Sequence, residues 1–437
     1  MKSFLSLSFN TIRRATATIS SKQKLKDLAA TSLYRNAVYL ILNTAITSLL
    51  GFFFWMIVAR YYSEAEVGYS SAIISAISLL VVISLAGLNS SIIRFLPRAE
   101  KPRELINSCL TFSGLASVII ATIFVMGIDF WSPALVFIKE NIVFTLAFII
   151  FTSVRTISTL VNDTFVASRK ANFVLFKSAI FSIVKLPLPV LLVSFFLSFG
   201  VVASWGIAAI VALAFSLFLL LPRVQANYKP IPALNTGMIK ELWRYSSISY
   251  VANLLSSSLG LILPLLVVNV LDSSQNAFFY VAWMLSSLLF AIPHAVSHSL
   301  FAEGSHFEDR LRENVLKSLK FIFLLLVPSI IVLVLAGKWL LLAFGQSYSL
   351  NALKLLWILS ISSLPVAFTS LYTTILRVKN RLKELIILWA CIVFIVLVVG
   401  YLTMPDIGIE GVGYAWLGTH ILVSIYIFAS KKLLPKK

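Results

Sequence analysis

Charged residues are scarce in this sequence of 437 residues. Aspartate, glutamate, lysine and arginine together make up 12% of it, whereas they make up about 25% of an average soluble domain. Hydrophobic residues account for 59%, and the mean hydropathy is +0.95. This composition excludes a soluble globular protein. It predicts an all-α polytopic membrane protein with room for about a dozen spans of roughly 20 residues each.

Cysteine and histidine are also rare. The two cysteines, Cys109 and Cys391, lie in or beside apolar runs in different halves of the chain, which argues against a disulfide framework. His294 and His298 are four residues apart and share one helical face, but no acidic residue or further histidine completes a metal-ligand set. We therefore expect no metal, no cofactor and no catalytic residue. The basic N-terminus lacks the short apolar core and cleavage site of a signal peptide, so none is expected.

Acidic residues are few relative to basic ones. The chain has 17 acidic residues against 36 lysines and arginines, which gives a net charge of +19. In a soluble protein this excess would suggest a nucleic-acid partner. In a polytopic membrane protein the simpler cause is the retention of lysine and arginine in cytoplasmic loops, so we expect no nucleic-acid partner.

The apolar runs predict twelve transmembrane helices. They lie near residues 36–59, 67–93, 105–127, 142–165, 173–196, 201–221, 246–270, 277–300, 316–336, 350–376, 383–403 and 409–430. A basic N-terminal arm, residues 1–35, precedes the first span, and a short basic tail, residues 431–437, follows the last one. We expect the arm to lie on anionic lipid headgroups in the cytoplasm.

The basic residues alternate from loop to loop. Thirty of the 36 fall in the arm, the even-numbered loops or the tail; loop 4–5 is assigned Arg169, Lys170 and Lys177, and loop 10–11 is assigned Arg377, Lys379, Arg381 and Lys383. The cations on the other side are Arg60, Lys139, Lys338 and Lys354. This asymmetry predicts that both termini are cytoplasmic. The protein is expected to be a multi-pass protein of the cell (inner or cytoplasmic) membrane.

A helix-breaking segment divides the spans into two groups of six. Residues 222–245 contain three prolines, which is typical of a linker. A weak repeat supports the division, because a shift of 209 places Ser63 on Asp272 and a shift of 210 places Asn43 on Asn253. We therefore predict an N-terminal six-helix lobe at 36–221, a cytoplasmic linker at 222–245 and a C-terminal six-helix lobe at 246–430, an arrangement typical of transporters.

Two cations, Arg155 and Lys185, remain within the apolar runs. Each lies about 20 Å from the basic turn 167–170, at about 1.5 Å per helical residue, so the two reach matching depth. A charge near the centre of a bilayer costs roughly 2.5–17 kcal/mol. The pair therefore predicts a polar cavity that takes an anionic guest. The alternative is a structural role, with the charge paired to Asp163 or to backbone carbonyls.

Two prolines follow Lys185 in the same apolar run. Pro187 and Pro189 remove backbone donors, so we expect a kink in this span and exposed carbonyl groups beside the ammonium. Such a kink would serve either bending during transport or a static geometry.

The first hairpin carries a family resemblance. Residues 58–72, VARYYSEAEVGYSSA, and residues 85–97, LAGLNSSIIRFLP, resemble the corresponding segments of the polysaccharide-exporter and O-antigen flippase branch of the multidrug/oligosaccharidyl-lipid/polysaccharide (MOP) flippase superfamily. Looser similarity continues through residues 164–170, TFVASRK, and residues 243–246, WRYS. The sequence departs from the usual turn at Ser63, where glycine or proline is frequent.

The resemblance implies a fold and a function. It implies two six-helix lobes around a central V-shaped cavity, which opens alternately to the two sides of the membrane. It also implies a non-enzymatic flippase that moves polyprenyl-diphosphate-linked oligosaccharide, an O-antigen or other surface polysaccharide precursor, across the cytoplasmic membrane. The expected partners are this lipid-linked diphosphate and membrane lipids, with H⁺ or Na⁺ considered as coupling ion, and the expected state is a monomer.

Arg155 and Lys185 are the primary substrate-binding candidates, and six further residues are secondary ones. Arg60 and Arg94 end the first two spans on opposite sides, where they would serve the outer and inner mouths or anchor the helices at the interface. Asn43, Asn89, Asn253 and His294 would contact sugars, or neighbouring helices instead. Because both central cations belong to the first lobe, we expect the C-terminal lobe to provide a less charged wall.

Two other functions remain open at this stage. A drug or metabolite exporter of the same superfamily (a MATE-like protein) would use buried acids to bind cations, and Asp163 is the one candidate. A membrane enzyme of polysaccharide assembly would need a large outer loop or a cluster of acids, histidines or metal ligands. The outer loops here are short and their acids are scattered.

Overall fold

The computed structural model of the chain describes residues 32–430 except for residue 197 and residues 307–309. Most of the N-terminal arm and all of the C-terminal tail lie outside the described residues. Within the described part every regular element is helical. Twelve of its helices, in one piece or two, are long and apolar enough to cross a membrane, as predicted.

The elements that form these spans and their connections have the following bounds. The N-terminal lobe contains α3 (Ser32–Tyr61), α4 (Glu64–Leu85), α5 (Leu88–Phe95), η1 (Leu96–Arg98), α6 (Pro102–Met126), α7 (Ile128–Trp131), η2 (Pro133–Leu135), α8 (Phe137–Glu140), α9 (Ile142–Ala167), α10 (Ala171–Lys185), α11 (Leu188–Phe196), α12 (Ser198–Phe215), η3 (Ser216–Leu220) and α13 (Leu221–Val224). The C-terminal lobe contains α14 (Thr236–Val270), α15 (Ser273–His306), α16 (Leu311–Leu342), α17 (Gln346–Asn351), α18 (Leu353–Val378), α19 (Leu382–Ile407) and α20 (Glu410–Ala429).

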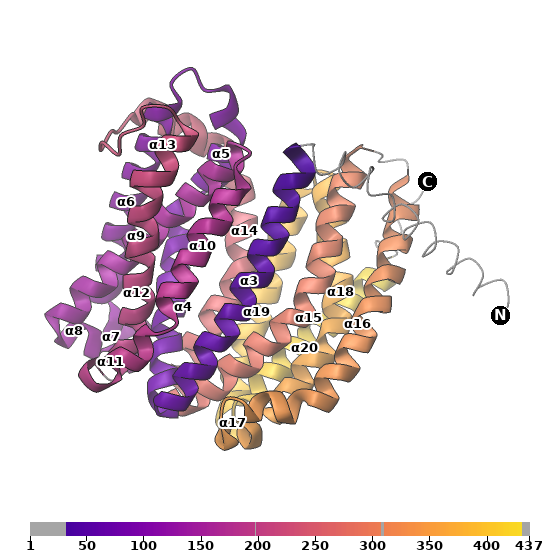
Figure 1. Ribbon diagram of the computed structural model, residues 1–437. Helices are drawn as coiled ribbons and strands as arrows, with labels where there is room; N and C mark the ends of the chain where they lie inside the picture. The colour runs from indigo at the N-terminus through magenta and orange to yellow at the C-terminus, as the bar shows by residue number, and fades with distance from the viewer. Residues whose placement is uncertain (1–31, 197, 307–309, 431–437) are drawn as a thin grey trace, which may run out of the picture.

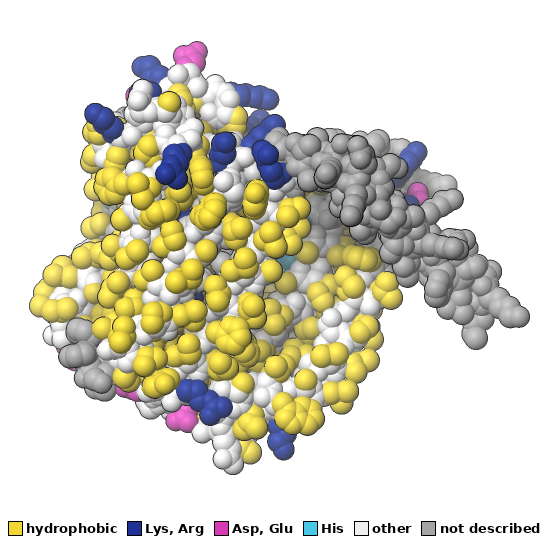
Figure 2. Space-filling model, viewed as in Figure 1, with side chains coloured by type: hydrophobic (Ala, Val, Ile, Leu, Met, Phe, Trp, Pro, Cys, Tyr) yellow, Lys and Arg dark blue, Asp and Glu magenta, His cyan; other side chains and the backbone are white. Residues whose placement is uncertain are grey.

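The two lobes lie beside each other with their helices running roughly in one direction. Figure 1 shows the N-terminal helices on the left and the C-terminal helices on the right, with α14 between them. The first span begins and the last span ends at the same face, the upper one in this view. Lysine and arginine side chains gather at that face above a broad apolar band (Figure 2), as the positive-inside rule requires of a cytoplasmic face.

The second span of each lobe begins with a side-chain cap. Ser63 caps α4: its hydroxyl accepts a hydrogen bond from the Glu66 N–H, and the Glu66 carboxylate accepts one from the Ser63 N–H at 2.8 Å. This capping box satisfies donors that a helix start would otherwise leave free, so serine suits the position where the related sequences have glycine or proline. Asp272 precedes α15 and accepts from the Gln275 N–H at 2.8 Å. The two capped turns are the ones that the sequence repeat aligns.

The outer ends of the lobes are joined closely. A Cβ atom on Gly68 would lie 1.6 Å from the Ser273 carbonyl oxygen, so α4 and α15 approach here at a distance that only glycine permits. Asn276 donates to the Gly68 carbonyl at 2.8 Å and to the Ser71 hydroxyl at 3.1 Å. Together these contacts connect the two lobes at their outer ends.

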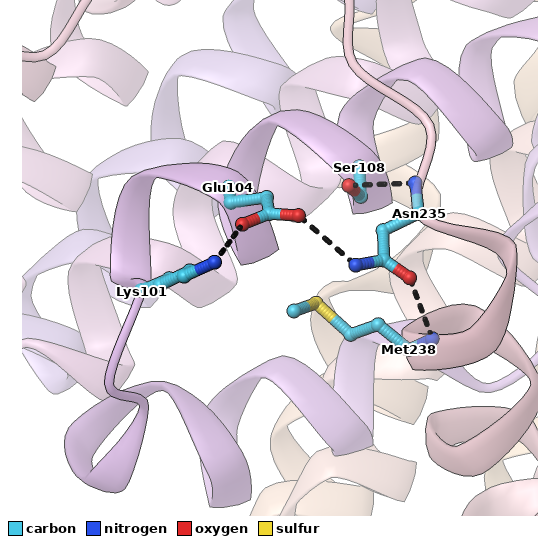
Figure 3. A network of polar contacts seen from close by, with 5 residues as sticks. All are labelled: Lys101, Glu104, Ser108, Asn235 and Met238. Atoms are coloured by element: carbon cyan, nitrogen blue, oxygen red, sulfur yellow. Dashed lines mark hydrogen bonds and ion pairs between the residues drawn. The ribbon is translucent and has the colours of Figure 1, made fainter.

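The segment between the lobes is bonded to the N-terminal lobe. Asn235 caps α14 by accepting from the Met238 N–H at 3.0 Å, and its amide donates to the Glu104 carboxylate at 2.9 Å (Figure 3). Its own N–H donates to the Ser108 hydroxyl at 3.2 Å. One asparagine therefore starts the first helix of the second lobe and attaches it to α6.

A buried tyrosine adds to this attachment. The Tyr228 hydroxyl donates to the Asn107 side-chain oxygen at 2.6 Å. Burial raises the pKa of Tyr228 well above its usual value, so the hydroxyl stays protonated and remains a donor at any physiological pH.

The close approach at Gly68 leads to a first prediction. Gly68→Ala should weaken the outer contact between α4 and α15, because the new methyl group overlaps the Ser273 backbone. The variant should therefore populate outward-open states more than the wild type. The measurement is maleimide labelling, from outside, of a cysteine placed at Ser75, which is buried on α4 two turns further in, in a chain without Cys109 and Cys391.

The matched control is Gly418→Ala. A Cβ atom there meets nothing within 4 Å, so labelling of the same cysteine should equal that of the parent. If Gly68→Ala also leaves the labelling rate at the parent value, the contact does not govern the outer opening.

Candidate functional site

Arg155 and Lys185 share one aromatic ring in the N-terminal lobe. The Arg155 guanidinium carbon lies 5.3 Å from the centre of the Phe181 ring and 4.7 Å from that of Trp205. The Lys185 ammonium lies 5.0 Å from Phe181 and 4.5 Å from Phe54. The structure thus brings the two cations together, on aromatic faces contributed by α3, α10 and α12.

The aromatic rings compensate part of the cost of these charges. A cation over an aromatic face gains about 0.5–2 kcal/mol, and the gain is larger where water is excluded. Lys185 is buried and Arg155 is half-buried. Among the described residues neither forms an ion pair with a carboxylate, so their charges are not neutralised and can attract an anion.

The kink predicted after Lys185 is present. The fifth span is divided into α10, which ends at Lys185, and α11, which begins at Leu188. The end of a helix carries free carbonyl groups and a partial negative charge, which favour a cation in the last turn. In α11 the backbone carbonyl of Pro189 accepts a hydrogen bond of 2.7 Å from the Tyr62 hydroxyl.

Lys177 is a third cation of this region, and its assignment to a cytoplasmic loop was wrong. It lies within α10 and is 3% exposed. Its ammonium donates to the Ser158 carbonyl and, at 2.9 Å, to the Asn162 side-chain oxygen. A signal for this position exists in the sequence: Lys177, Phe181 and Lys185 are spaced by four residues, so they lie on one face of the helix.

Asp163 interacts electrostatically with Lys177. One of its carboxylate oxygens is buried without a hydrogen-bond partner among the described residues. In place of the alternative pairing of Arg155 with Asp163, the structure therefore shows an interaction of Asp163 with Lys177. We call Arg155, Lys177 and Lys185 the cationic cluster.

A cavity of about 590 Å³ lies in the C-terminal lobe. Helices α14, α15, α18, α19 and α20 line it with polar, aromatic and aliphatic residues: Asn253, Ser256, Ser257, Leu259, Gly260, Trp283, Ser287, Phe290, Ala291, His294, Ser297, His298, Phe301, Val366, Thr369, Ser370, Thr373, Thr374, Arg377, Trp389, Trp416 and His420. Two of the secondary candidates, Asn253 and His294, are among them. None of these described residues is a carboxylate.

Arg377 corrects a second expectation. It belongs to the last turn of α18 rather than to loop 10–11, and it lines the cavity, where its guanidinium donates to the Asn253 side-chain oxygen at 3.3 Å. The C-terminal lobe thus has a half-buried cation. It was not identified from the sequence, because Arg377 was counted among the basic residues of loop 10–11. The spacing of Thr369, Thr373 and Arg377 by four residues marks a polar face of this span and could have revealed it.

Arg60 and Arg94 lie at opposite ends of the lobes, far from a shared site. Arg60, at the outer end of α3, donates to the carbonyls of Leu342 and Ala343 at 3.0 and 2.9 Å. Arg94, at the cytoplasmic end of α5, donates to the Tyr245 hydroxyl, and its guanidinium carbon lies 4.2 Å from the centre of that ring. Each arginine therefore connects the N-terminal lobe to the C-terminal one.

The two remaining candidates are not brought into either site. Asn43 is half-buried on α3, and its side-chain oxygen has no partner among the described residues. Asn89 is half-buried on α5. Among the described residues, no group of three or more histidine, cysteine, aspartate or glutamate side chains could hold a metal ion.

The arrangement of the helices is that of known membrane transporters. An inward-facing multidrug resistance transporter of the MATE family, MOP superfamily, superposes with a TM-score of 0.67 over 91% of this chain and 98% of that one, at 16% identity. The lipid II flippase MurJ, in an inward closed conformation, gives 0.67 over 90% and 87%, at 14% identity. A MOP superfamily transporter from Pyrococcus furiosus, whose reversed polarity of the binding pocket suggests a different function, gives 0.62 over 93% and 96%, at 13% identity. The fold is that of the MOP transporters.

The sequence identifies the family more closely. Residues 57–352, more than half of the chain, match the model of the polysaccharide biosynthesis protein family, and the chain belongs to this family. No curated protein matches the sequence. Family and fold together support a membrane flippase or exporter and confirm the resemblance to MOP flippases.

The contacts of Lys177 give a second prediction. Lys177→Met removes the donor to Ser158 and Asn162 and leaves these buried groups unpaired. A buried polar group without a partner costs about 1–3 kcal/mol. The variant should therefore unfold at a lower fraction of sodium dodecyl sulfate than the wild type when it is titrated in mixed micelles.

Lys170→Met is the control, because Lys170 is exposed in the turn before α10. Equal unfolding midpoints for the two variants would show that the buried contacts of Lys177 do not stabilise the lobe. Addition of Asp163→Asn to Lys177→Met should recover part of the loss, since it removes the charge that faces the missing ammonium.

Proposed function

We propose that this protein is a flippase that moves polyprenyl-diphosphate-linked oligosaccharide, an O-antigen or other surface polysaccharide precursor, from the inner to the outer leaflet of the cytoplasmic membrane. One observation carries the proposal. Two cations without a carboxylate partner share an aromatic ring inside one lobe, in a chain of the polysaccharide biosynthesis family.

The diphosphate is the part of such a cargo that resists crossing the membrane. It is anionic, and it loses its hydration when it enters the membrane interior. A guanidinium can bind phosphate oxygens through two parallel hydrogen bonds, and an ammonium acts as a compact second charge. Arg155 and Lys185 lie against the same ring of Phe181, so one diphosphate could contact both. Lys177 is engaged by Ser158 and Asn162 and links α10 to α9 beside the two cations.

The contacts at the two ends of the lobes suit alternating access. At the outer end Arg60 and Asn276 connect the lobes and would have to release for outward opening. At the cytoplasmic end Arg94 holds Tyr245, close to where the cargo would be loaded. Asn253 and His294 would contact the part of the cargo that reaches the C-terminal lobe, and Asn43 and Asn89 would serve helix contacts. A gradient of H⁺ or Na⁺, or the membrane voltage, is the proposed energy source.

The positive charge of the cationic cluster favours this function over that of an exporter of cationic drugs. Exporters of cationic compounds need buried negative charge at their site. Here the carboxylate of Asp163 interacts with Lys177, and no acid is among the described residues that line the C-terminal cavity. The two lobes therefore offer cations and neutral groups to a ligand, which suits an anionic lipid-linked sugar.

Transport in proteoliposomes tests the proposal. Arg155→Ala and Lys185→Ala should each slow the flipping of a fluorescent polyprenyl-diphosphate oligosaccharide about tenfold or more, because each removes a hydrogen bond to a charged group, worth about 1.5–3 kcal/mol. Arg155→Lys should retain part of the rate, since it keeps the charge but loses the paired geometry.

Lys139→Ala provides the control, since this lysine is a partly exposed cation of the outer loop. Rates at the wild-type value in both Arg155→Ala and Lys185→Ala would remove the cluster from the mechanism. Protection of growing cells against cationic dyes, combined with no flipping of the lipid-linked sugar, would instead identify a MATE-like exporter.

A further inference from the structure

The cavity of the C-terminal lobe contains polar atoms that the protein leaves without partners. The indole nitrogens of Trp389 and Trp416, the Nε2 atom of His420 and the hydroxyl of Ser297 have no hydrogen-bond partner among the described residues. All four side chains are buried, with at most 7% of their surface exposed, and all four line this cavity.

Such a concentration is unusual for a protein interior. Buried polar groups are nearly always hydrogen-bonded, and leaving one unpaired costs about 1–3 kcal/mol. Here the unpaired groups belong to residues of α15, α19 and α20, which are distant in the sequence, and all four residues line the same cavity. A polar ligand that enters this space would supply the missing partners.

The walls combine aromatic faces with hydroxyl groups. The ring centres of Trp283 and Trp416 lie 4.9 Å apart in an edge-to-face arrangement, and that of Phe290 lies 5.8 Å from each. Hydroxyl groups from α15 and α18 belong to the same lining. A pyranose ring has an apolar face of C–H bonds and a rim of hydroxyls, and this pattern matches both surfaces. The volume of about 590 Å³ falls within the range of about 300–1,000 Å³ that is usual for ligand pockets.

The charges of the lining narrow the class of ligand. Among the described residues of the lining, Arg377 is the one permanently charged side chain and none is a carboxylate. A cationic ligand would find no counter-charge there. A neutral or weakly anionic ligand with many hydroxyl groups fits the cavity.

We infer that the cavity of the C-terminal lobe is a carbohydrate-binding subsite, which receives neutral sugar units while the cationic cluster of the N-terminal lobe holds the diphosphate. The identity of the cargo rests on the proposed function, but the affinity of the cavity for sugars does not. Trp416, Trp389, His420 and Ser297 form the hydrogen-bonding contacts to sugar hydroxyls. Arg377 and Asn253 lie at the cytoplasmic end of the cavity, toward the side from which the cargo is loaded.

Saturation-transfer difference NMR on the full chain in phospholipid nanodiscs, prepared without glycosidic detergents, tests the inference. The probes are glucose, N-acetylglucosamine and maltose, with glycerol as the polyol control. The wild type should transfer saturation to the ring protons of at least one sugar and not to glycerol. Trp416→Phe, which keeps an aromatic ring but loses the indole N–H, and Ser297→Ala should each weaken binding roughly three- to tenfold, which is the effect of one hydrogen bond.

The matched control is Trp357→Phe. The Trp357 indole donates to the Val334 carbonyl at 3.2 Å, and the residue lies outside the cavity lining, so sugar binding should be unchanged. If none of the three sugars gives a signal above empty nanodiscs, or if Trp416→Phe and Ser297→Ala both bind like the wild type, the carbohydrate subsite is wrong.

Sugar binding and flipping, measured on the same protein, distinguish this inference from the proposed function. Sugar binding that depends on Trp416 and Ser297, without flipping of a lipid-linked oligosaccharide, would uphold the subsite and contradict the flippase. Flipping by the wild type, with unaltered sugar binding in both cavity variants, would uphold the flippase and contradict the subsite.

Discussion

A cation that leaves water must find other groups to replace its hydration, and this requirement shapes the N-terminal lobe. The desolvation cost of a buried charge exceeds most other single contributions to the stability of a protein. The lobe meets it without neutralising Arg155 or Lys185, through three aromatic faces and through the end of a helix that two prolines interrupt. The packing of α3, α10 and α12 follows from the need to place these faces around the charges.

The two lobes compensate their polar groups in opposite ways. In the N-terminal lobe Arg155 and Lys185 lie against aromatic rings, and the Lys177 ammonium donates hydrogen bonds to the Ser158 carbonyl and the Asn162 side chain. In the C-terminal lobe most polar groups of the cavity lining are neutral, with Arg377 as the charged one among the described residues, and several have no partner among these residues. A cargo with an anionic and a neutral part would use both lobes at once, whereas a small cation would suit neither.

The sequence allowed the fold to be predicted more fully than the sites. Twelve apolar runs and the prolines after Lys185 are local signals, and each has its counterpart in the structure. Lys177 and Arg377 were placed in loops because they lie near other basic residues, although the direction of a side chain depends on the helical face and not on nearby charge. The cavity could not be foreseen, since Trp389, Trp416 and His420 join Ser297 in one lining only after α19 and α20 pack against each other and against α14 and α18.

The helix α14 is attached to one lobe and lines the cavity of the other. In its first half Tyr250 donates to the Ile83 carbonyl at 3.0 Å, and near its end Asn269 accepts from the Ala134 N–H at 2.9 Å; both partners belong to the N-terminal lobe. Between these two attachments Asn253, Ser256 and Gly260 form one wall of the cavity. Under the proposed alternating access, a rocking of the lobes would pull on this wall through both attachments, and the width of the cavity would be coupled to the opening of the membrane path.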